Sequence, residues 1–339
     1  MAFSFLTQEL AIDLGTANTV IFVGDKIVVD EPSIVAIDQK SGKPIAYGHA
    51  AKLMQGKTHD NIKTIRPLKD GVIADFNAAE QMIRGFVKMI NKKKSLFQPN
   101  LKMVVCIPSG STEVEIRAVR DSSEHAGGKD VYIIYEPMAA ALGIGLDVLA
   151  PSGHMVVDIG GGTTEIAVIS LGGIVCKESI RVAGDVFTSD IQQHMRQQHN
   201  IKIGEVMAEQ IKINVGSAMI DLENAPEPYI VRGPNLMTAH PVEVAVTSQE
   251  IAHCLDKSLA KIENAILTVL EQTPPELYSD IVQEGIFLTG GGALLRGLDI
   301  RLHDKINIPF NVADDPLKAV ARGTSIAIKK IGKLPFLMR

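Results

Sequence analysis

The sequence has no tryptophan, and aromatic residues make up only 4% of its 339 positions. Hydrophobic residues still account for 46% of the chain, so we expect a core built from aliphatic side chains. No uncharged apolar run approaches the roughly 20 residues that a transmembrane helix needs. The N-terminal segment also lacks the basic start and the long apolar stretch of a secretory signal. These absences predict a cytoplasmic protein.

Cysteine is scarce, and Cys106, Cys176 and Cys254 stand singly, without a CxxC pair or a Cys/His cluster of zinc spacing. We interpret them as small buried hydrophobic residues in a reducing compartment. An excess of basic residues is missing as well, because 34 Lys and Arg face 39 Asp and Glu, for a net charge of −5. A mildly acidic chain argues against binding nucleic acid through a broad basic surface.

Two common nucleotide-binding signatures are also missing. The sequence has no GxxxxGK[ST] motif, which excludes a P-loop protein. The glycines Gly160, Gly161 and Gly162 follow Asp158 and lead into the β-rich run 163–170, whereas a Rossmann turn opens a helix. The pattern therefore disfavours a dehydrogenase.

What the sequence does contain is an alternation of strand and helix patterns. At ~150 residues per domain, the length predicts about two domains. Strand-like runs at 103–108 and 131–134 each precede a helical stretch, the first of them capped by Thr112 and Glu115. Strands followed by helices predict an α/β fold with a mostly parallel sheet. Further helices are predicted at 78–91, 188–199, 205–215, 248–272 and 316–331.

One motif occurs twice at long range. Asp13-Leu14-Gly15-x-x-x-Thr19-x-Ile21 recurs as Asp158-Ile159-Gly160-x-x-x-Thr164-x-Ile166, at a constant offset of 145 positions (158 minus 13). Each copy predicts a strand, a tight turn and a returning strand. A single Asp-x-Gly would most simply be a turn, but two independent turns would rarely copy each other. The repeat predicts two duplicated α/β lobes with a cleft between them.

The chemistry of these turns points to an anion and a cation. Glycines and small hydroxyl residues let backbone N–H groups approach phosphate closely. One turn from each lobe can clamp a polyphosphate between them. Asp13 and Asp158, at the strand ends, supply hard oxygen ligands for Mg²⁺, directly or through water.

Five motifs together resemble those of the MreB family of bacterial actin homologues, within the actin, sugar-kinase and DnaK-type chaperone superfamily. The resemblance extends from about Leu10 to Ile331 and implies an actin-like ATPase fold with bound ATP or ADP. Lobe I would comprise 1–147 plus 316–339, and lobe II 148–315, with small subdomains at about 33–66 and 183–244. The motifs are DLGTAN at 13–18, DGVIADF at 70–76, EPMAAA at 136–141, DIGGGTTE at 158–165 and TGGGALLRG at 289–297.

The resemblance also implies roles for residues at matching positions, with Asp13 and Asp158 organising Mg²⁺. One side of the phosphates would be wrapped by Gly15, Thr16, Ala17 and Asn18, and the other by Gly160, Gly161, Gly162 and Thr163. The adenosine side would be lined by Gly290, Gly291 and Gly292, where side chains would block the base or ribose. Glu209 and Lys212 would flank the ribose and base, and Gly184 and Asp185 would form a further contacting turn.

Glu136 is the residue that the resemblance implies for positioning the attacking water, with Thr163 beside it, in a slow ATPase coupled to filament dynamics. From the residue alone, a solvated carboxylate at a helix start is the favoured interpretation of Glu136. Lys212 is likewise compatible with an exposed lysine paired to Glu209 three positions away. The family usually has a second acidic residue before the glutamate, and here Tyr135 stands there, which leaves the rate of hydrolysis open.

The segment 92–99 joins three lysines to Leu96 and Phe97. The residues alone allow either a solvated charge run whose apolar pair folds back, or contact with anionic lipid. The resemblance favours insertion of Leu96 and Phe97 into the inner face of the cell membrane. It also implies a homopolymer of paired protofilaments that organises cell-wall synthesis and rod shape with RodZ- and MreC-type proteins.

Two other activities of the superfamily are weighed against this one. A chaperone-type ATPase needs a peptide-binding domain after the ATPase core, and the sequence stops at Arg339. A small-molecule kinase usually has larger inserts and a base for the substrate hydroxyl, for which we find no clear candidate. The sequence therefore favours a cytoskeletal ATPase.

Overall fold

The structure is a computed structural model that describes residues 7–90 and 100–339. Leu96 and Phe97, predicted to contact the membrane, lie outside these ranges. Among the described helices, none combines the length and the apolar character that crossing a membrane requires.

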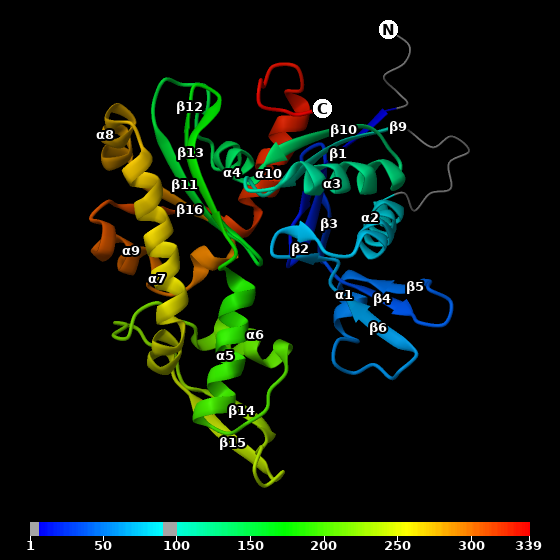
Figure 1. Cartoon of the computed structure of the whole chain (residues 1–339), viewed down its shortest axis with the longest axis vertical. Helices are drawn as coiled ribbons and strands as arrows, with labels where there is room; N and C mark the ends of the chain where they lie inside the picture. Colours follow the sequence, from blue (N-terminus) through cyan, green and yellow to red (C-terminus); the bar gives the residue numbers. More distant parts are fainter. Residues whose placement is uncertain (1–6, 91–99) are drawn as a thin grey trace.

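Two five-stranded sheets organise the described chain, one on each side of the view in Figure 1. The first has the order β10-β9-β1-β2-β3 and the second the order β13-β12-β11-β16-β17. In each sheet three consecutive strands pair antiparallel, and two later strands join in parallel. The prediction of a mostly parallel sheet was therefore wrong, because each sheet begins with strands that are joined by hairpin turns. The strands are β1 Thr7–Leu14, β2 Asn18–Val23, β3 Lys26–Pro32, β9 Asn100–Ile107, β10 Gly128–Tyr135, β11 His154–Ile159, β12 Thr164–Ser170, β13 Gly173–Ile180, β16 Ile286–Thr289 and β17 Phe310–Val312.

The two sheets repeat each other down to the register of their first hairpins. Asp13 pairs with Val20 in the first sheet, and Asp158 pairs with Glu165 in the second. Both members of the second pair lie 145 positions beyond their counterparts, the offset of the sequence repeat. The predicted duplication of α/β units is thus confirmed, and we call the units lobe I and lobe II.

Helices cover both sheets. Helix α7 has the bounds that the sequence predicts. Its start is set by Thr247, whose side chain accepts a hydrogen bond from the N–H of Glu250 (3.2 Å). The predicted capping box of Thr112 and Glu115 is also present, at the start of α3. The helices are α2 Phe76–Ile90, α3 Glu113–His125, α4 Glu136–Gly143, α5 Gly184–Gln198, α6 Glu205–Val215, α7 Ser248–Gln272, α8 Pro275–Glu284, α9 Leu298–Ile306 and α10 Ala319–Lys329.

Helices α4 and α10 lie between the two sheets (Figure 1). One core cluster joins Val104 of the first sheet and Val156 of the second to both helices. The helices cross so closely that a Cβ on Gly143 would overlap the carbonyl of Ala319, and one on Gly323 that of Ala139. This crossing joins the two lobes through one shared core.

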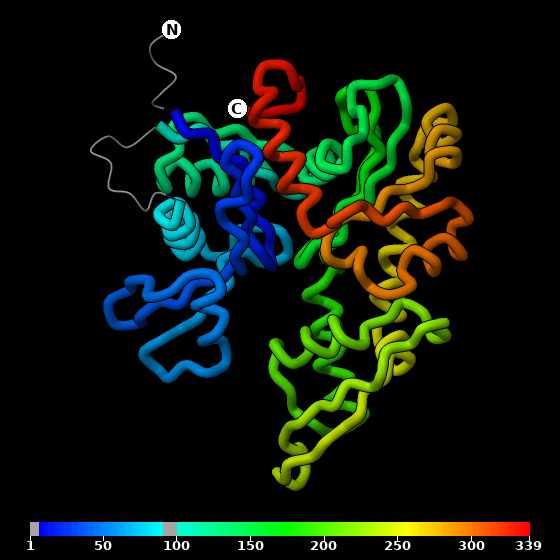
Figure 2. The backbone as a smooth tube through the Cα atoms, turned by 180° about the vertical axis from the view of Figure 1, so that it is seen from behind, coloured from blue at the N-terminus to red at the C-terminus, as the bar shows by residue number. Residues whose placement is uncertain are grey.

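Each lobe carries a smaller unit on the same side of the molecule, as the backbone trace shows (Figure 2). In lobe I it is the sheet β5-β4-β6 with helix α1, and in lobe II it contains α6 and the hairpin β14–β15. The lobe I unit lies within the range predicted for its small subdomain, whereas strand β15 of the lobe II unit extends two residues beyond the predicted end at 244. The boundaries of the lobes and of their subdomains stay a prediction. The elements are β4 Val35–Asp38, β5 Pro44–Tyr47, α1 Gly48–Lys52, β6 Ile62–Ile65, β14 Tyr229–Pro234 and β15 Pro241–Val246.

Some elements were not predicted from the sequence. Strand β13 and the three-residue β17 are short or partly exposed and give weak patterns. Helix α8 follows Pro274 directly and begins at Pro275, because proline fits the first turn of a helix as well as it ends one. The last helix was expected from Pro316, but residues 316–318 form a 3₁₀ turn and α10 begins at Ala319.

Candidate functional site

The two repeated turns face each other where the lobes meet. A Cβ added to Gly161 would lie 2.8 Å from the Cβ of Ala17, and one on Gly162 would lie 2.6 Å from Oγ1 of Thr16. Only glycine therefore allows this approach. The structure brings together the two turns that the sequence predicts, 15–18 and 160–163.

Asp13 and Asp158 are the next-to-last residues of β1 and β11, directly before these turns. Oδ1 of Asp13 accepts a hydrogen bond from Sγ of Cys106 (3.2 Å), and Oδ1 of Asp158 accepts one from Oγ1 of Thr289 (2.9 Å). Cys106 and Thr289 lie on the neighbouring parallel strands, β9 and β16. The two aspartates thus have equivalent supports in the two lobes.

Both aspartates have raised pKa values. Burial raises the pKa of Asp13 to about 6, against the lowering effect of the Cys106 hydrogen bond. Burial raises the pKa of Asp158 to about 7, opposed by Thr289 and increased by the charges of Asp13 and Glu165. Carboxylates held together away from water are suited to a hard divalent cation, which would relieve their repulsion.

Glu136 is the first residue of α4 and lies among the same carboxylates. Burial raises its pKa well above the usual value, and the charges of Glu165, Asp158 and Asp13 add to this effect. The N-terminus of α4 partly offsets the cost of a charge at this position. The structure thus places the predicted catalytic glutamate beside the predicted metal-organising aspartates.

Thr163 is 6% exposed and is held by the turn at Asp70 and Gly71. A Cβ on Gly71, whose φ is +79°, would lie 2.7 Å from Cγ2 of Thr163. The N–H of Gly71 donates to Oγ1 of Thr16 on the opposite turn (3.0 Å). The motif at 70–76 therefore ties the two turns together.

Helix α5 begins against the second turn. The N–H groups of Gly184 and Asp185 donate to the carbonyls of Gly160 (3.1 Å) and Gly161 (2.7 Å). These bonds fix the conformation of the turn from behind. The Asp185 side chain itself points to a partner in lobe I, Arg66.

Glu209 and Lys212 form one cluster with the start of α5. Their side chains are 2.7 Å apart, and Nζ of Lys212 also donates to the carbonyl of Gly184 (2.9 Å) and to Oγ1 of Thr188 (3.1 Å). Burial would raise the pKa of Glu209, but Lys212 and the Thr188 hydroxyl outweigh it and lower that pKa. Lys212 is therefore not simply an exposed helix lysine.

Arg66 spans the lobes and was missed by the sequence analysis. Its Nη2 lies 2.8 and 3.0 Å from the carboxylate oxygens of Asp185, and its Nη1 donates to Glu205 (2.7 Å). Gln55 of the same small subdomain also donates to Glu205 (3.0 Å). No local pattern could have indicated this contact, because the partners lie 119 and 139 positions away.

Glu165 is a second residue that sequence reasoning did not select for the site. It is fully buried, and its oxygens accept hydrogen bonds from the N–H (2.8 Å) and hydroxyl (2.6 Å) of Ser109 and from the Ser179 hydroxyl (2.5 Å). Its charge raises the pKa of Glu136. The available signals were its place at the end of the motif at 158–165 and the apolar run 166–169 that follows it.

The three glycines after β16 differ in their surroundings. A Cβ on Gly290, with φ of +78°, would lie 2.6 Å from Oδ1 of Asp158, and one on Gly292 would overlap Ile159. These two glycines are therefore needed for packing against β11, whatever they contact in a ligand. Gly291 is exposed, and its nearest neighbour would be Cδ2 of Leu317 at 3.1 Å.

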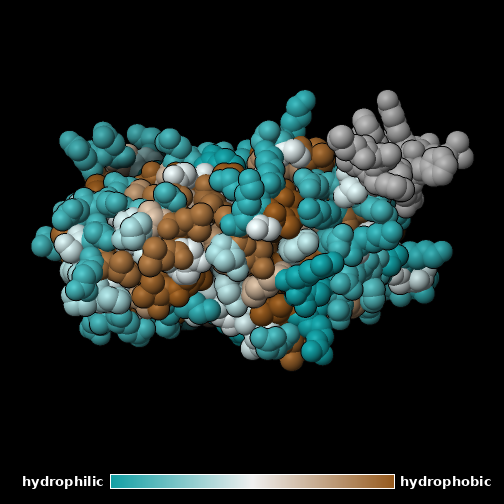
Figure 3. Space-filling view, turned by 90° about the horizontal axis from the view of Figure 1, so that it is seen from above, coloured by the Kyte–Doolittle hydropathy of each residue, from teal (hydrophilic) through white to brown (hydrophobic). Residues whose placement is uncertain are grey.

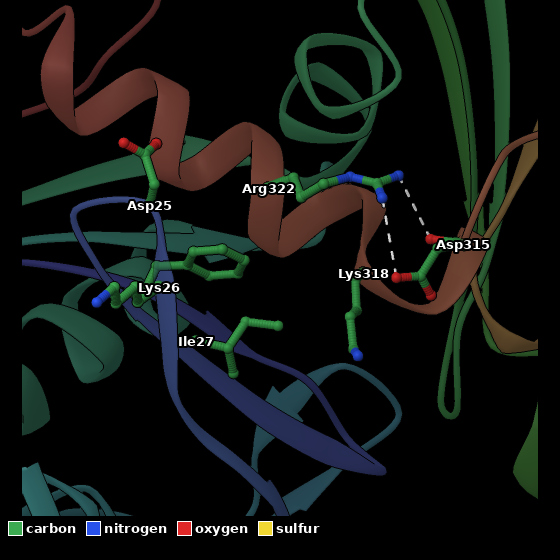
Figure 4. A pocket seen from close by; sticks show the side chains of 7 residues that line it. Asp25, Lys26, Ile27, Asp315, Lys318 and Arg322 are labelled. Carbon is green, nitrogen blue, oxygen red and sulfur yellow. Dashed lines mark hydrogen bonds and ion pairs between the residues drawn. The ribbon is translucent and has the colours of Figure 1, made fainter.

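A separate recess of about 500 Å³ lies between the β2–β3 turn and the start of α10 (Figure 4). An ion pair of Arg322 with Asp315 borders it. Of the predicted site residues that the structure describes, none lines it. Its walls are formed by Phe22, Asp25, Lys26, Ile27, Asp315, Lys318 and Arg322.

A family model described as MreB/Mbl protein matches residues 7–335. The chain belongs to the MreB/Mbl family. It is 45% identical to the cell shape-determining protein Mbl of Bacillus subtilis (strain 168), over 97% of this chain and 98% of that one. It is 49% identical to the cell shape-determining protein MreB of Escherichia coli (strain K12), over 96% and 94% of the two chains.

Solved structures confirm the actin-like fold expected of an MreB/Mbl protein. MreB5 of Spiroplasma citri bound to AMPPNP matches with a TM-score of 0.90 and 39% identity, covering 96% of this chain and 97% of that one. The same protein bound to ADP matches equally well. A MamK double helical filament has a TM-score of 0.80 at 20% identity, over 97% and 100% of the chains, and supports the fold alone.

Proposed function

We propose that this chain is an ATP-binding and ATP-hydrolysing actin-like cytoskeletal protein that organises cell-wall synthesis and maintains rod shape. The observation that carries the proposal is the meeting of the two duplicated turns, with Asp13, Asp158 and Glu136 clustered behind them. The relatives named as cell shape-determining proteins, and MreB5 with AMPPNP or ADP, support it.

The nucleotide would lie between the lobes, with its phosphates at the two turns. Backbone N–H groups of 15–18 and 160–163 would bind the phosphates. Glu209 and Lys212 would flank the ribose and base, with the exposed Gly291 opposite. Asp13 and Asp158 would hold Mg²⁺, directly or through water, and the ion supplies charge neutralisation for the phosphates.

Hydrolysis would depend on Glu136, with Thr163 beside it, to orient a water in line with the terminal phosphate. A carboxylate whose pKa is raised by burial and like charges is a stronger proton acceptor when ionised. Hydrogen bonds from the hydroxyls of Ser109 and Ser179 hold the neighbouring Glu165 in position.

The hydrolytic role is tested by Glu136→Ala. This variant should retain ATP and assemble but release phosphate more slowly, by the 10²–10⁴-fold typical of losing an acid–base group. Glu113→Ala, in the exposed first turn of α3, is the matched control and should leave the rate unchanged. Equal phosphate release from both variants would remove Glu136 from the mechanism.

Self-association is proposed as head-to-tail assembly into paired protofilaments. The upper face of the molecule shows brown hydrophobic areas among hydrophilic ones (Figure 3). Leu149, Leu171 and Val175, around the β12–β13 turn and the loop before β11, are exposed. Apolar surface of this kind is commonly buried in protein–protein contacts.

Attachment to the inner face of the cell membrane is proposed through Leu96 and Phe97, with RodZ- and MreC-type proteins as partners. A weak membrane contact in each subunit, repeated along a filament, would give the whole filament a much higher affinity for the membrane. Electron microscopy of the protein with ATP and lipid vesicles tests this, and membrane-bound paired filaments are expected. A monomer that phosphorylates a small molecule would contradict the proposal.

The anchor itself is tested by changing Leu96 and Phe97 to Ser together, which should weaken binding in vesicle co-sedimentation. Leu53→Ser is a suitable control, because Leu53 is 73% exposed in the small subdomain of lobe I. Full vesicle binding by the double variant would place the anchor elsewhere.

A further inference from the structure

Three side chains converge where helix α5 ends and helix α7 begins, away from the nucleotide site. Nε2 of His194 lies 2.6 Å from Oε1 of Glu250, and Nε2 of His199 contacts the same oxygen. The three ligand atoms all lie within 4.8 Å of one another. We propose that His194, His199 and Glu250 bind a divalent transition-metal ion of the Zn²⁺ class.

The backbone holds the two histidines in position. His194 lies inside α5, and His199 follows the last residue of that helix. Residues five positions apart do not share one face of a regular helix. The helix end at His199 and the positive φ of Asn200 (52°) break that regularity, and the carbonyl of Met195 accepts from both His199 (3.3 Å) and Ile201 (3.2 Å).

Glu250 is held in position by the start of helix α7. It is in the first turn of α7, where its N–H donates to the Thr247 hydroxyl. In a full capping box the glutamate side chain would return to the backbone of the cap residue. Here it turns to the two imidazoles of α5 instead, so the carboxylate joins the two helices.

The donor set matches the chemistry of zinc. Two imidazole nitrogens and one carboxylate oxygen are the ligands of many three-residue zinc sites, which keep a fourth position for water. The two rings meet edge to face, with centroids 6.0 Å apart, so their edges converge on one point instead of stacking. Slight rotation of the side chains would admit an ion at the ~2.0–2.2 Å that Zn–N and Zn–O bonds require.

The site is accessible and electrostatically suited to a cation. The side chains of His194, His199 and Glu250 are 18%, 26% and 22% exposed, so an ion can enter from solvent. The C-terminal end of α5 carries the negative end of its helix dipole, which opposes the positive end of α7 at Glu250. Asp190 and Glu250 also add negative potential, which with burial raises the pKa of the nearby Cys254 to about 12.

A bound ion would cross-link α5 to α7 in lobe II. The Ser258 hydroxyl already donates to Asp190 across the same two helices (2.5 Å), one turn before His194 in α5 and two turns after Glu250 in α7. The metal would stabilise the end of α5 opposite to the one that holds the Gly160–Gly161 turn. No sequence pattern indicated this site, because Glu250 lies 51 positions after His199 and the spacing fits no zinc motif.

The test uses the full chain, first stripped of metal with a chelator. Titration calorimetry with Zn²⁺, with Mg²⁺ in excess, should show saturable uptake of about one ion per chain with release of protons. Co²⁺ in its place should give the visible absorption of a low-symmetry N/O site. Melting temperature should rise with Zn²⁺ in the wild type.

His199→Gln and Glu250→Gln should each abolish the uptake, the Co²⁺ spectrum and the Zn²⁺-dependent rise in melting temperature. His154→Gln is the matched control, because it breaks a single His–Glu pair with Glu284 (2.8 Å) and should leave all three readouts intact. Circular dichroism establishes that each variant is folded, and His194→Asn replaces any that is not. Absence of saturable uptake, or uptake unchanged in the variants, would show an ion pair only and overturn the proposal. None of these readouts requires ATP or filaments.

Discussion

Cys106 and Thr289 are structural equivalents in the two lobes, and each donates a hydrogen bond to the aspartate on the adjacent strand. The distances are 3.2 Å from Sγ to Asp13 and 2.9 Å from Oγ1 to Asp158. The strand registers agree, since Ile12 pairs with Val105 as Val157 pairs with Leu288. Both lobes thus keep a hydrogen-bond donor to the aspartate, but the donor is a thiol in lobe I and a hydroxyl in lobe II.

Thr289→Val removes the stronger of these donors. A hydrogen bond to a charged group contributes ~1.5–3 kcal/mol, so the ionised form of Asp158 becomes harder to maintain and its pKa rises further. We expect Mg²⁺-dependent nucleotide binding at pH 7 to weaken by roughly tenfold or more, at ~1.4 kcal/mol per tenfold. Titration with a fluorescent ATP analogue measures this. Thr289→Ser keeps the hydroxyl and should bind nearly normally, and equal affinity of the two variants would contradict the role of the hydroxyl.

Stability should fall with rising pH because of the same carboxylates. The folded pKa values of Asp13 (about 6) and Asp158 (about 7) lie above their ordinary values, so the folded state binds more protons than the unfolded state between pH ~4 and 7. The free energy of unfolding contributed by these groups therefore decreases over that window and levels off above it. Urea unfolding without Mg²⁺ at pH 5, 6, 7 and 8 measures the slope. Asp158→Asn should flatten it, and parallel profiles would contradict the prediction.

Arg66→Ala should loosen the contact between the small subdomain of lobe I and lobe II. Arg66, Asp185 and Glu205 are partly exposed, so each pair contributes ~0.2–1 kcal/mol. Loss of both pairs should speed release of bound nucleotide by about fivefold, corresponding to ~1 kcal/mol. Chase with unlabelled ATP measures the rate. Arg84→Ala breaks an ion pair with Glu80 inside α2 and serves as the control. Identical rates of nucleotide release from both variants would show that the Arg66 contacts do not retain the nucleotide.

Gly323→Ala should strongly destabilise the protein. Its added Cβ would overlap the carbonyl of Ala139, and a backbone atom of a packed helix cannot move aside. Overpacking of a core typically costs ~1–3 kcal/mol, and the backbone clash places this variant at the upper end or beyond. Gly204→Ala, with no atom within 4 Å of the added Cβ, should stay within about 1 kcal/mol of the wild type. Denaturant unfolding compares the two, and similar midpoints would contradict the close crossing.

The sequence supported a correct fold because its strongest signals were local. The Asp-x-Gly repeat reflects one hairpin register that recurs 145 positions later, and Thr247 with Glu250 marks the start of α7. Pro275 shows the limit of such signals, since proline both ends and begins helices.

The site was predictable only in part. The turns and Asp13, Asp158 and Glu136 lie in contiguous motifs and come together in the structure. The contacts of Arg66 and the buried position of Glu165 depend on residues that only the tertiary fold brings near. Long-range pairing of single charged residues leaves no periodic trace in a sequence.

The crossing of α4 and α10 couples rotation of the two lobes to the positions of residues at the candidate site. Glu136 begins α4, and the carbonyl of Pro316, just before α10, accepts from the N–H of Gly290 (3.0 Å). At the crossing, Gly143 and Gly323 bring the two helix backbones into direct contact, so the helices cannot slide past each other. Turning one lobe against the other would therefore move Glu136 and the 290–292 turn in concert.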